Sequence, residues 1–151
     1  MIGYAGREVF TEQESRLFQL ATLAVAHIPD DVDPDPNGVR CHEVARAVGR
    51  QLGLLVIDGR FGSVDHSWLH IMNGTKATRD RHSILDVYSV ARLPVVQLVD
   101  SHFSTQMMSL YRPGEQRKDI RGSVLDKINA LLDRHFRRQM TSLNKLPLVQ
   151  T

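Results

Sequence analysis

Residues 40–62 read RCHEVARAVGRQLGLLVIDGRFG, and the pattern of apolar residues changes in the middle of this stretch. From Cys41 to about Gly53, apolar residues recur with a period near 3.6, as expected for an amphipathic helix. The segment LLVIDGRFG that follows is short and rich in apolar and β-branched residues, which favours a strand. The stretch therefore predicts a helix that leads directly into a sheet.

Another helix is predicted ahead of this stretch, at about residues 11–28. Thr11 and Glu14 form a capping-box pattern, and apolar residues follow them at helical spacing, namely Leu17, Leu20, Leu23 and Ala24. Between this helix and Cys41 lies PDDVDPDPNG, whose content of Asp, Pro and Gly is typical of a loop. The first third of the chain is therefore expected to be helical.

Beyond the first strand, three more segments have the composition of strands, namely HSWLHIM, SILDVYS and PVVQLVD. The segment YRPGEQRKDIRG is expected to be a loop or arm, and Ser123 to begin a last helix. The tail, residues 141–151, has no clear period and is expected to be loose. Together these elements predict a single α+β domain over residues 1–151, with its core at about 11–138. In this domain N-terminal helices and a closing helix pack on an antiparallel sheet of about four strands.

The composition limits the classes of function. The chain has 151 residues and a formal net charge of +2, and its basic residues are scattered without interleaved aromatic residues, which argues against a nucleic-acid surface. No apolar stretch reaches the ~20 residues of a membrane span, and the N-terminus lacks the pattern of a signal peptide. A lone cysteine excludes an internal disulfide framework. We expect a cytoplasmic protein that acts on or binds a peptide or a protein.

Cys41 is a candidate for a chemical role because it falls in the first turn of the predicted helix. Backbone N–H groups there have no partner within the helix, and the positive end of the helix dipole favours a thiolate. The alternative is that Cys41 is a small apolar residue on the buried stripe of the helix. For this cysteine considered alone, the alternative is favoured.

His66 is the best-placed base for such a thiolate because it opens a predicted strand directly after a turn. Trp68 and His70 follow at alternate positions, so the three side chains share one face of the strand. A Trp beside a catalytic imidazole excludes water and holds the ring, which makes Trp68 and His70 candidates for a substrate pocket. The alternative is a Trp packed in the core between two partly exposed histidines.

Asp86 lies within SILDVYS, a segment otherwise suited to a buried strand. Aspartate is depleted in strands and costly to bury without a partner. A hydrogen bond from a histidine N–H removes that cost and fixes the tautomer of the imidazole, as in a catalytic triad. The alternatives are an edge-strand Asp86 that faces solvent, and Asp100 as a rival acid.

The order of the three residues carries more information than any one of them. Cys41 on a helix is followed after 25 residues by His66 on a strand, and after 20 more by Asp86 on the next strand. In this order, RCHEVARAVGRQLGL, DHSWLHI and SILDVYS resemble the transglutaminase-like branch of the papain-like cysteine protease superfamily, which includes the leader peptidases that process lasso peptides. The resemblance covers about residues 36–100. It implies a papain-like or transglutaminase-like core, with Cys41 as nucleophile, His66 as general base and acid, and Asp86 orienting His66.

The chain departs from that family in two places. His42 and Glu43 follow the cysteine, where many members have Gly or Tyr beside it, and the polar hairpin MNGTKATRDRHS replaces a Gly-Trp turn ahead of the Asp. These differences leave the acyl-enzyme mechanism untouched but put the substrate pocket in doubt. The backbone N–H of Cys41 is the expected oxyanion donor, and the nearest side-chain amide for a second donor is that of Asn37. Because Asn37 lies in the sequence PNG, a simple turn is the favoured explanation for it.

A metal site is a competing interpretation of the histidines. His66 and His70, with Cys41 or His42, offer three ligands of the kinds that zinc prefers. No CxxC or HExxH motif accompanies them, so the triad is preferred and neither a metal nor a cofactor is expected.

The expected function is therefore a cysteine hydrolase or acyltransferase that acts on an amide or peptide bond through a thioester. The alternative from another class is a non-catalytic protein-binding module built on the same fold.

Overall fold

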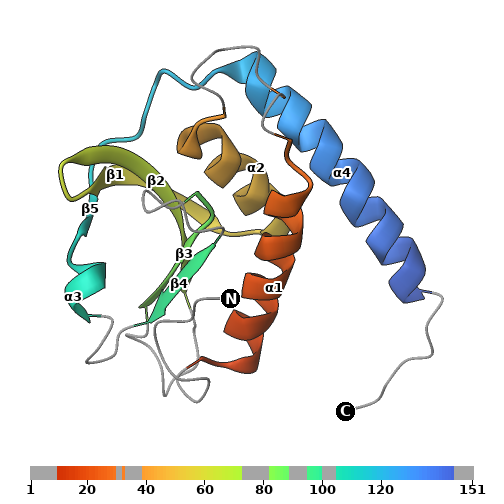
Figure 1. Cartoon of the computed structure of the whole chain (residues 1–151), viewed down its shortest axis with the longest axis horizontal. Coiled ribbons are helices and arrows are strands. Elements are labelled where there is room, and N and C mark those ends of the chain that lie inside the picture. The colour runs from red at the N-terminus through yellow and green to blue at the C-terminus, as the bar shows by residue number, and fades with distance from the viewer. Residues whose placement is uncertain are drawn as a thin grey trace.

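The computed structural model describes residues 10–29, 32, 39–72, 82–88, 95–99 and 105–144 of the chain. Within these ranges the elements follow in the order α1 (Glu12–Ala26), α2 (Cys41–Leu52), β1 (Leu55–Phe61), β2 (Val64–Met72), β3 (His82–Asp86), β4 (Val96–Val99), α3 (Thr105–Met108), β5 (Tyr111–Pro113) and α4 (Gly122–Asn144). Figure 1 shows α1 and α2 beside the sheet and α4 on the outer side of α2. The fold is α+β, as the sequence predicted.

The sheet has the strand order β4-β3-β2-β1-β5, and every neighbouring pair is antiparallel. On β2, His66 lies opposite Gly59 of β1, and Leu69 lies opposite Leu85 of β3. Asp86 is the last residue of β3. His66 and Asp86 are therefore on adjacent antiparallel strands, as expected from the hairpin between them.

The sheet has five strands where the sequence predicted about four. The segment that begins YRP, expected to be a loop or arm, contributes β5 at the edge of the sheet, with Tyr111 opposite Phe61. A Cβ atom at Gly59 would collide with the carbonyl oxygen of Arg112, so the close approach of β5 to β1 requires glycine there. A three-residue strand that ends in Pro113 has no compositional signal. The short helix α3 was not expected either.

Alternation along β2 divides the residues of the sheet between two faces. Leu69 and Ile71 belong to the main core, which also contains residues of α1, α2 and α4. Trp68 belongs to a second cluster with Ile84, Val96 and Tyr111. His66 lies on the face of Trp68, whereas Ser67 lies on the helix-covered face with Leu69. The beginning of β2 can therefore present polar groups on both faces.

The helix boundaries follow their capping signals. Thr11 caps α1, accepting a hydrogen bond from the backbone N–H of Glu14, whose carboxylate accepts one from the backbone N–H of Thr11. α2 ends at Gly53, which has a left-handed φ of 67°. α4 extends to Asn144, so it includes residues 141–144 of the expected tail, and residues 145–151 lie outside the described residues. None of the described helices is long and apolar enough to cross a membrane.

Candidate active site

Cys41 is the first residue of α2, and its side chain is 8% exposed. The residue before it, Arg40, makes no side-chain capping hydrogen bond to the helix. The first N–H groups of α2 therefore receive no such cap, and the positive end of the helix dipole acts on the sulfur. Both effects stabilise a thiolate relative to a thiol.

One imidazole beside Cys41 belongs to His66, which is bound directly to a carboxylate. His66 Nε2 donates to Asp86 Oδ2 at 2.8 Å, and both side chains are 1% exposed. Asp86 also accepts hydrogen bonds from the hydroxyl of Tyr111 at 2.7 Å and from the backbone N–H of Tyr88 at 3.2 Å. The three donors offset the cost of burying the carboxylate, which made Asp86 unusual within a strand.

A second imidazole, that of His42 in the first turn of α2, contacts the sulfur. Its Nδ1 lies 3.5 Å from Cys41 Sγ and 2.7 Å from Ser67 Oγ. The Ser67 hydroxyl donates its only hydrogen to Asp58 Oδ1 at 2.5 Å, so it can only accept from His42. The hydrogen bonds therefore place a proton on His42 Nδ1.

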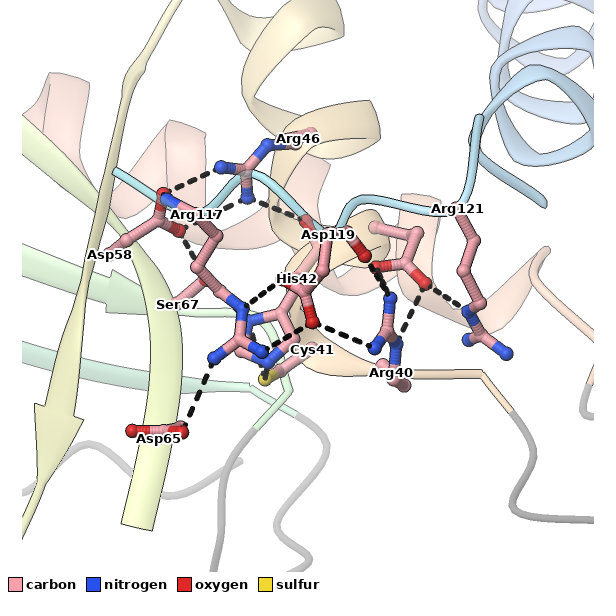
Figure 2. A network of polar contacts seen from close by, with 11 residues as sticks. Arg40, Cys41, His42, Arg46, Asp58, Asp65, Ser67, Arg117, Asp119 and Arg121 are labelled. Atoms are coloured by element: carbon pink, nitrogen blue, oxygen red, sulfur yellow. Dashed lines mark hydrogen bonds and ion pairs between the residues drawn. The ribbon is translucent and has the colours of Figure 1, made fainter. Parts of the chain in front are cut away.

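His42, Ser67 and Asp58 thus form a chain of hydrogen bonds, which we call the second relay, the first being His66 with Asp86. Asp58, at its end, is bound by the guanidinium of Arg46 and by a backbone N–H. Arg46 of α2 donates to both of its carboxylate oxygens, at 3.1 and 2.6 Å, and the backbone N–H of Arg117 donates at 2.9 Å (Figure 2). Burial acts to raise the pKa of Asp58, but the hydrogen bonds from Arg46, Ser67 and Arg117 outweigh it and lower that pKa. Asp58 is therefore an anion whose charge is compensated by Arg46 rather than by His42.

The thiol and the His66 imidazole shift each other's pKa in opposite directions. Burial acts to raise the pKa of Cys41, but hydrogen bonding and charge from His42 and His66 lower it to about 6. Burial acts to lower the pKa of His66, but the hydrogen bond to Asp86 and the interaction with Cys41 raise it to about 9. Between these two values Cys41 is a thiolate and His66 an imidazolium.

Aromatic side chains surround His66. Trp68 stacks against it with ring centroids 6.2 Å apart, and Phe61 and Tyr111 lie at the same centroid distance. Trp68 is 2% exposed and also packs in the second core cluster, as its structural interpretation expected, but His66 beside it is 1% exposed rather than partly exposed. His70 lies four residues beyond His66 on the same strand, about 13 Å along it, and Trp68 stands between them.

A strap, residues 114–121, connects β5 to α4 and passes the first turn of α2 (Figures 1 and 2). Arg40 donates to the carbonyl oxygen of Asp119 at 2.9 Å, and Arg117 forms an ion pair with Asp65 at 3.5 Å. Asp65 and Arg40 immediately precede His66 and Cys41, so the strap bridges the residues next to the thiol and its base. Its far end is anchored by Arg121, which pairs with the buried carboxylate of Glu43 at 2.6 Å.

Two further sequence-based interpretations concern a second oxyanion donor and a zinc site. Asn37, the candidate for a second oxyanion donor, lies outside the described residues. For the zinc alternative, the described part of the chain contains no group of three or more His, Cys, Asp and Glu side chains that could hold a metal ion.

Sequence reasoning missed the relay on the helix-covered face, although one signal for it was present. Asp58 interrupts the apolar strand residues of β1 just as Asp86 interrupts those of β3. The argument that a buried strand aspartate needs a partner applies equally to both. Ser67 and Tyr111 had no such signal, because a hydroxyl is common at many kinds of position.

Comparison of the chain with protein-family models, with curated proteins and with solved structures found no match.

Proposed function

We propose that the protein is a cysteine hydrolase or acyltransferase that acts on an amide or peptide bond through a thioester on Cys41. The observation that carries the proposal is the placement of one buried sulfur at a helix N-terminus beside an imidazole that is hydrogen-bonded to a buried carboxylate. A nucleophile, a base and a group that orients the base are the parts that covalent acyl transfer requires.

The proposed reaction begins with attack of the Cys41 thiolate on the carbonyl carbon, which forms a C–S bond and an oxyanion. Because Nε2 of His66 is bound to Asp86, Nδ1 is the ring nitrogen left to serve Cys41. Protonated His66 gives its proton to the amide nitrogen as the C–N bond breaks and the amine leaves. Water, or an amine in a transferase, then gives a proton to His66 and attacks the thioester carbon, and Cys41 leaves as a thiolate.

The backbone N–H of Cys41 is the proposed oxyanion donor. It lies at the start of α2, where N–H groups point out of the helix and the side chain of the N-cap residue Arg40 makes no capping hydrogen bond. Asp86 and Tyr111 act through His66: the carboxylate holds Nε2–H, and the phenol hydroxyl holds the carboxylate.

We further propose membership of the transglutaminase-like branch of the papain-like superfamily. The support is the order of Cys41, His66 and Asp86 on a helix and on two adjacent antiparallel strands. A free thiol as nucleophile also suits a reducing compartment such as the cytoplasm.

A non-catalytic protein-binding module is the second candidate, and the burial of the site favours it. Cys41 is 8% exposed and His66 is 1% exposed, so a substrate carbonyl reaches the sulfur only if neighbouring groups give way. In such a module His42 and His66 would stabilise the fold and would have no catalytic role.

Alkylation of the thiol separates the two candidates. Because Cys41 is the only cysteine, mass spectrometry of the intact protein reports its reaction with iodoacetamide unambiguously. If the protein is an enzyme, the folded protein at pH 7 should react faster than a free model thiol, and His66→Ala should slow that reaction. The matched control is His27→Ala, because His27 is exposed at the end of α1, where it bonds the carbonyl oxygen of Leu23.

A rate below that of the free thiol, with reaction only in unfolded protein, would contradict the enzyme and support the binding module. A panel of peptide amides, incubated with wild type and with Cys41→Ala, then identifies the acyl group through a thioester mass on the protein.

A further inference from the structure

A polar cavity of about 390 Å³ lies beside the proposed active site, between the β1–β2 hairpin and the chain after β5. Its charged lining residues are Arg60, Asp65, Arg112, Glu115 and Arg117. Three guanidinium groups thus face two carboxylates, and one of the three, that of Arg117, is bound outside the lining by both carboxylate oxygens of Asp119, at 2.9 and 2.8 Å.

The cations of this cavity are only partly neutralised by the protein. Arg112 donates to the carbonyl oxygen of Gly62 at 2.7 Å, and it has no ion-pair partner among the residues that the structure describes. Arg60 pairs with Asp65 at 3.6 Å, a distance longer than a good charge-assisted hydrogen bond, whereas Arg117 is neutralised by its bidentate pair with Asp119. The side chains of Arg60 and Asp65 are 60% and 61% exposed, so their pairing is weak.

Some residues that line the cavity are neighbours of the proposed catalytic residues in the sequence and in the sheet. Asp65 immediately precedes His66, and Gly59 in the cavity wall lies opposite His66 in the β1–β2 register. Arg117 donates its backbone N–H to Asp58, the end of the relay that begins at Cys41 and His42. The cavity wall and the proposed catalytic groups are therefore formed by neighbouring residues of β1, β2 and the strap.

We propose that this cavity is a substrate subsite that binds a carboxylate of the peptide acylating Cys41, held by Arg60 and Arg112. The proposal rests on the proposed function, since it names the substrate class of that site. Guanidinium groups present paired N–H donors that match the two oxygens of a carboxylate. The carboxylate is either a chain terminus or an acidic side chain, because both offer the same chemistry.

Charge-matched alkylating peptides test the subsite without knowledge of the natural substrate. Iodoacetyl-Gly-Gly with a free terminus and the same compound as its amide differ only in a terminal carboxylate. Iodoacetyl-Gly-Asp amide and iodoacetyl-Gly-Asn amide differ only in a side-chain carboxylate. The measured quantity is the acid-to-amide ratio of the alkylation rates of Cys41, divided by the same ratio for a free model thiol.

A normalised ratio of about 5 is expected for wild type, the size of one partly screened charge interaction near a protein surface. The double variant Arg60→Gln/Arg112→Gln should lower the ratio toward 1. Glu115→Gln removes a carboxylate from the lining and should raise it. Arg50→Gln is the matched control, because Arg50 pairs with Asp133 on α4 and should leave the ratio unchanged.

Each arm has an outcome against the subsite. A ratio near 1 in wild type, or an elevated ratio that the double variant and Glu115→Gln leave unaltered, overturns it. Whichever of the two compound pairs shows the elevated ratio identifies the source of the carboxylate. The neutral compounds report separately on the proposed function, because an unactivated Cys41 reacts slowly with them whatever the ratio.

Discussion

The two histidines beside Cys41 have different hydrogen-bond partners, although each is connected to a buried aspartate. His66 donates directly to Asp86, whereas His42 donates to the hydroxyl of Ser67, which in turn donates to Asp58. A carboxylate in direct contact stabilises an imidazolium, but a hydroxyl does not do so to the same degree. The same two residue types therefore give one imidazole a carboxylate partner and the other a hydroxyl partner.

The aspartates also differ in what balances their charge. Asp58 is paired with Arg46, and this guanidinium largely neutralises its negative charge. Little of that charge therefore acts on His42 through Ser67. Asp86 is held by Tyr111, by a backbone N–H and by His66, of which only His66 can carry a positive charge. We infer that His66 carries the proton during the reaction and that His42 positions and polarises the sulfur.

Separate replacement of the two histidines should give the largest difference between the relays. His66→Gln removes the proton donor and acceptor, so amide turnover should fall by about a thousandfold. His42→Gln keeps a donor of similar size, so turnover should fall by about tenfold. Initial rates on a cleaved peptide amide measure both, with circular dichroism to verify folding. Equal losses in the two variants would show that the histidines share one role.

Replacement of Asp86 should mainly reduce turnover, whereas replacement of Asp58 should mainly reduce stability. Asp86→Asn cannot stabilise an imidazolium, so turnover should fall by about a hundredfold with modest loss of stability. Asp58→Asn leaves Arg46 without its anion, so the free energy of unfolding should fall by about 3 kcal/mol while turnover is less affected. Urea unfolding and initial rates distinguish the two. A larger loss of turnover in Asp58→Asn than in Asp86→Asn would contradict the assignment.

The pH profile should reflect the His66 and Cys41 pair. Because alkylation needs the thiolate and the pKa of Cys41 is lowered to about 6, the rate should fall about tenfold from pH 7 to pH 5. Turnover also needs protonated His66, whose pKa is raised to about 9, so turnover should decline above that pH as well.

Variants should divide this profile between the histidines. His42→Leu should move the acidic midpoint to higher pH and keep the decline near pH 9, whereas His66→Gln should abolish that decline. Rates measured from pH 4 to 10 in buffers of constant ionic strength give both limbs. A pH 9 decline that survives in His66→Gln would assign it to another group.

The hydroxyls at the two relays should have the smallest effects. Tyr111→Phe removes one of the three donors to Asp86, a loss of about 1 kcal/mol that should change turnover severalfold. Ser67→Ala breaks the link from His42 to Asp58 and should change turnover less. The ratio of the two turnover losses measures the difference, and a greater loss in Ser67→Ala would reverse the roles of the relays.

Local patterns in the sequence were sufficient for most of the fold. The capping box at Thr11, the period of 3.6 after Cys41 and the β-branched segments predict α1, α2 and strands β1 to β4. The missed strand β5 pairs residues about fifty positions apart through the space left by Gly59. Pairing between such distant segments leaves no local period, so composition alone does not reveal it.

The contact between His66 and Asp86 was predictable for a related reason. A single hairpin separates them, and a buried aspartate in a strand requires a partner, so one local argument pairs the two residues. The same argument was available for Asp58, but its partners come from α2, from β2 and from the strap. Its environment depends on how three separate segments pack, which no spacing encodes.

By itself, the sequence determined α1, α2 and α4, four of the strands, and the position of a lone cysteine at the start of α2, because periodicity and capping are properties of neighbouring residues. Only the tertiary structure decided which of two histidines is bound directly to a carboxylate and which to a hydroxyl. Hydrogen bonds between side chains are made over about 3 Å, and the approach of distant elements to that distance is set by packing of the whole domain.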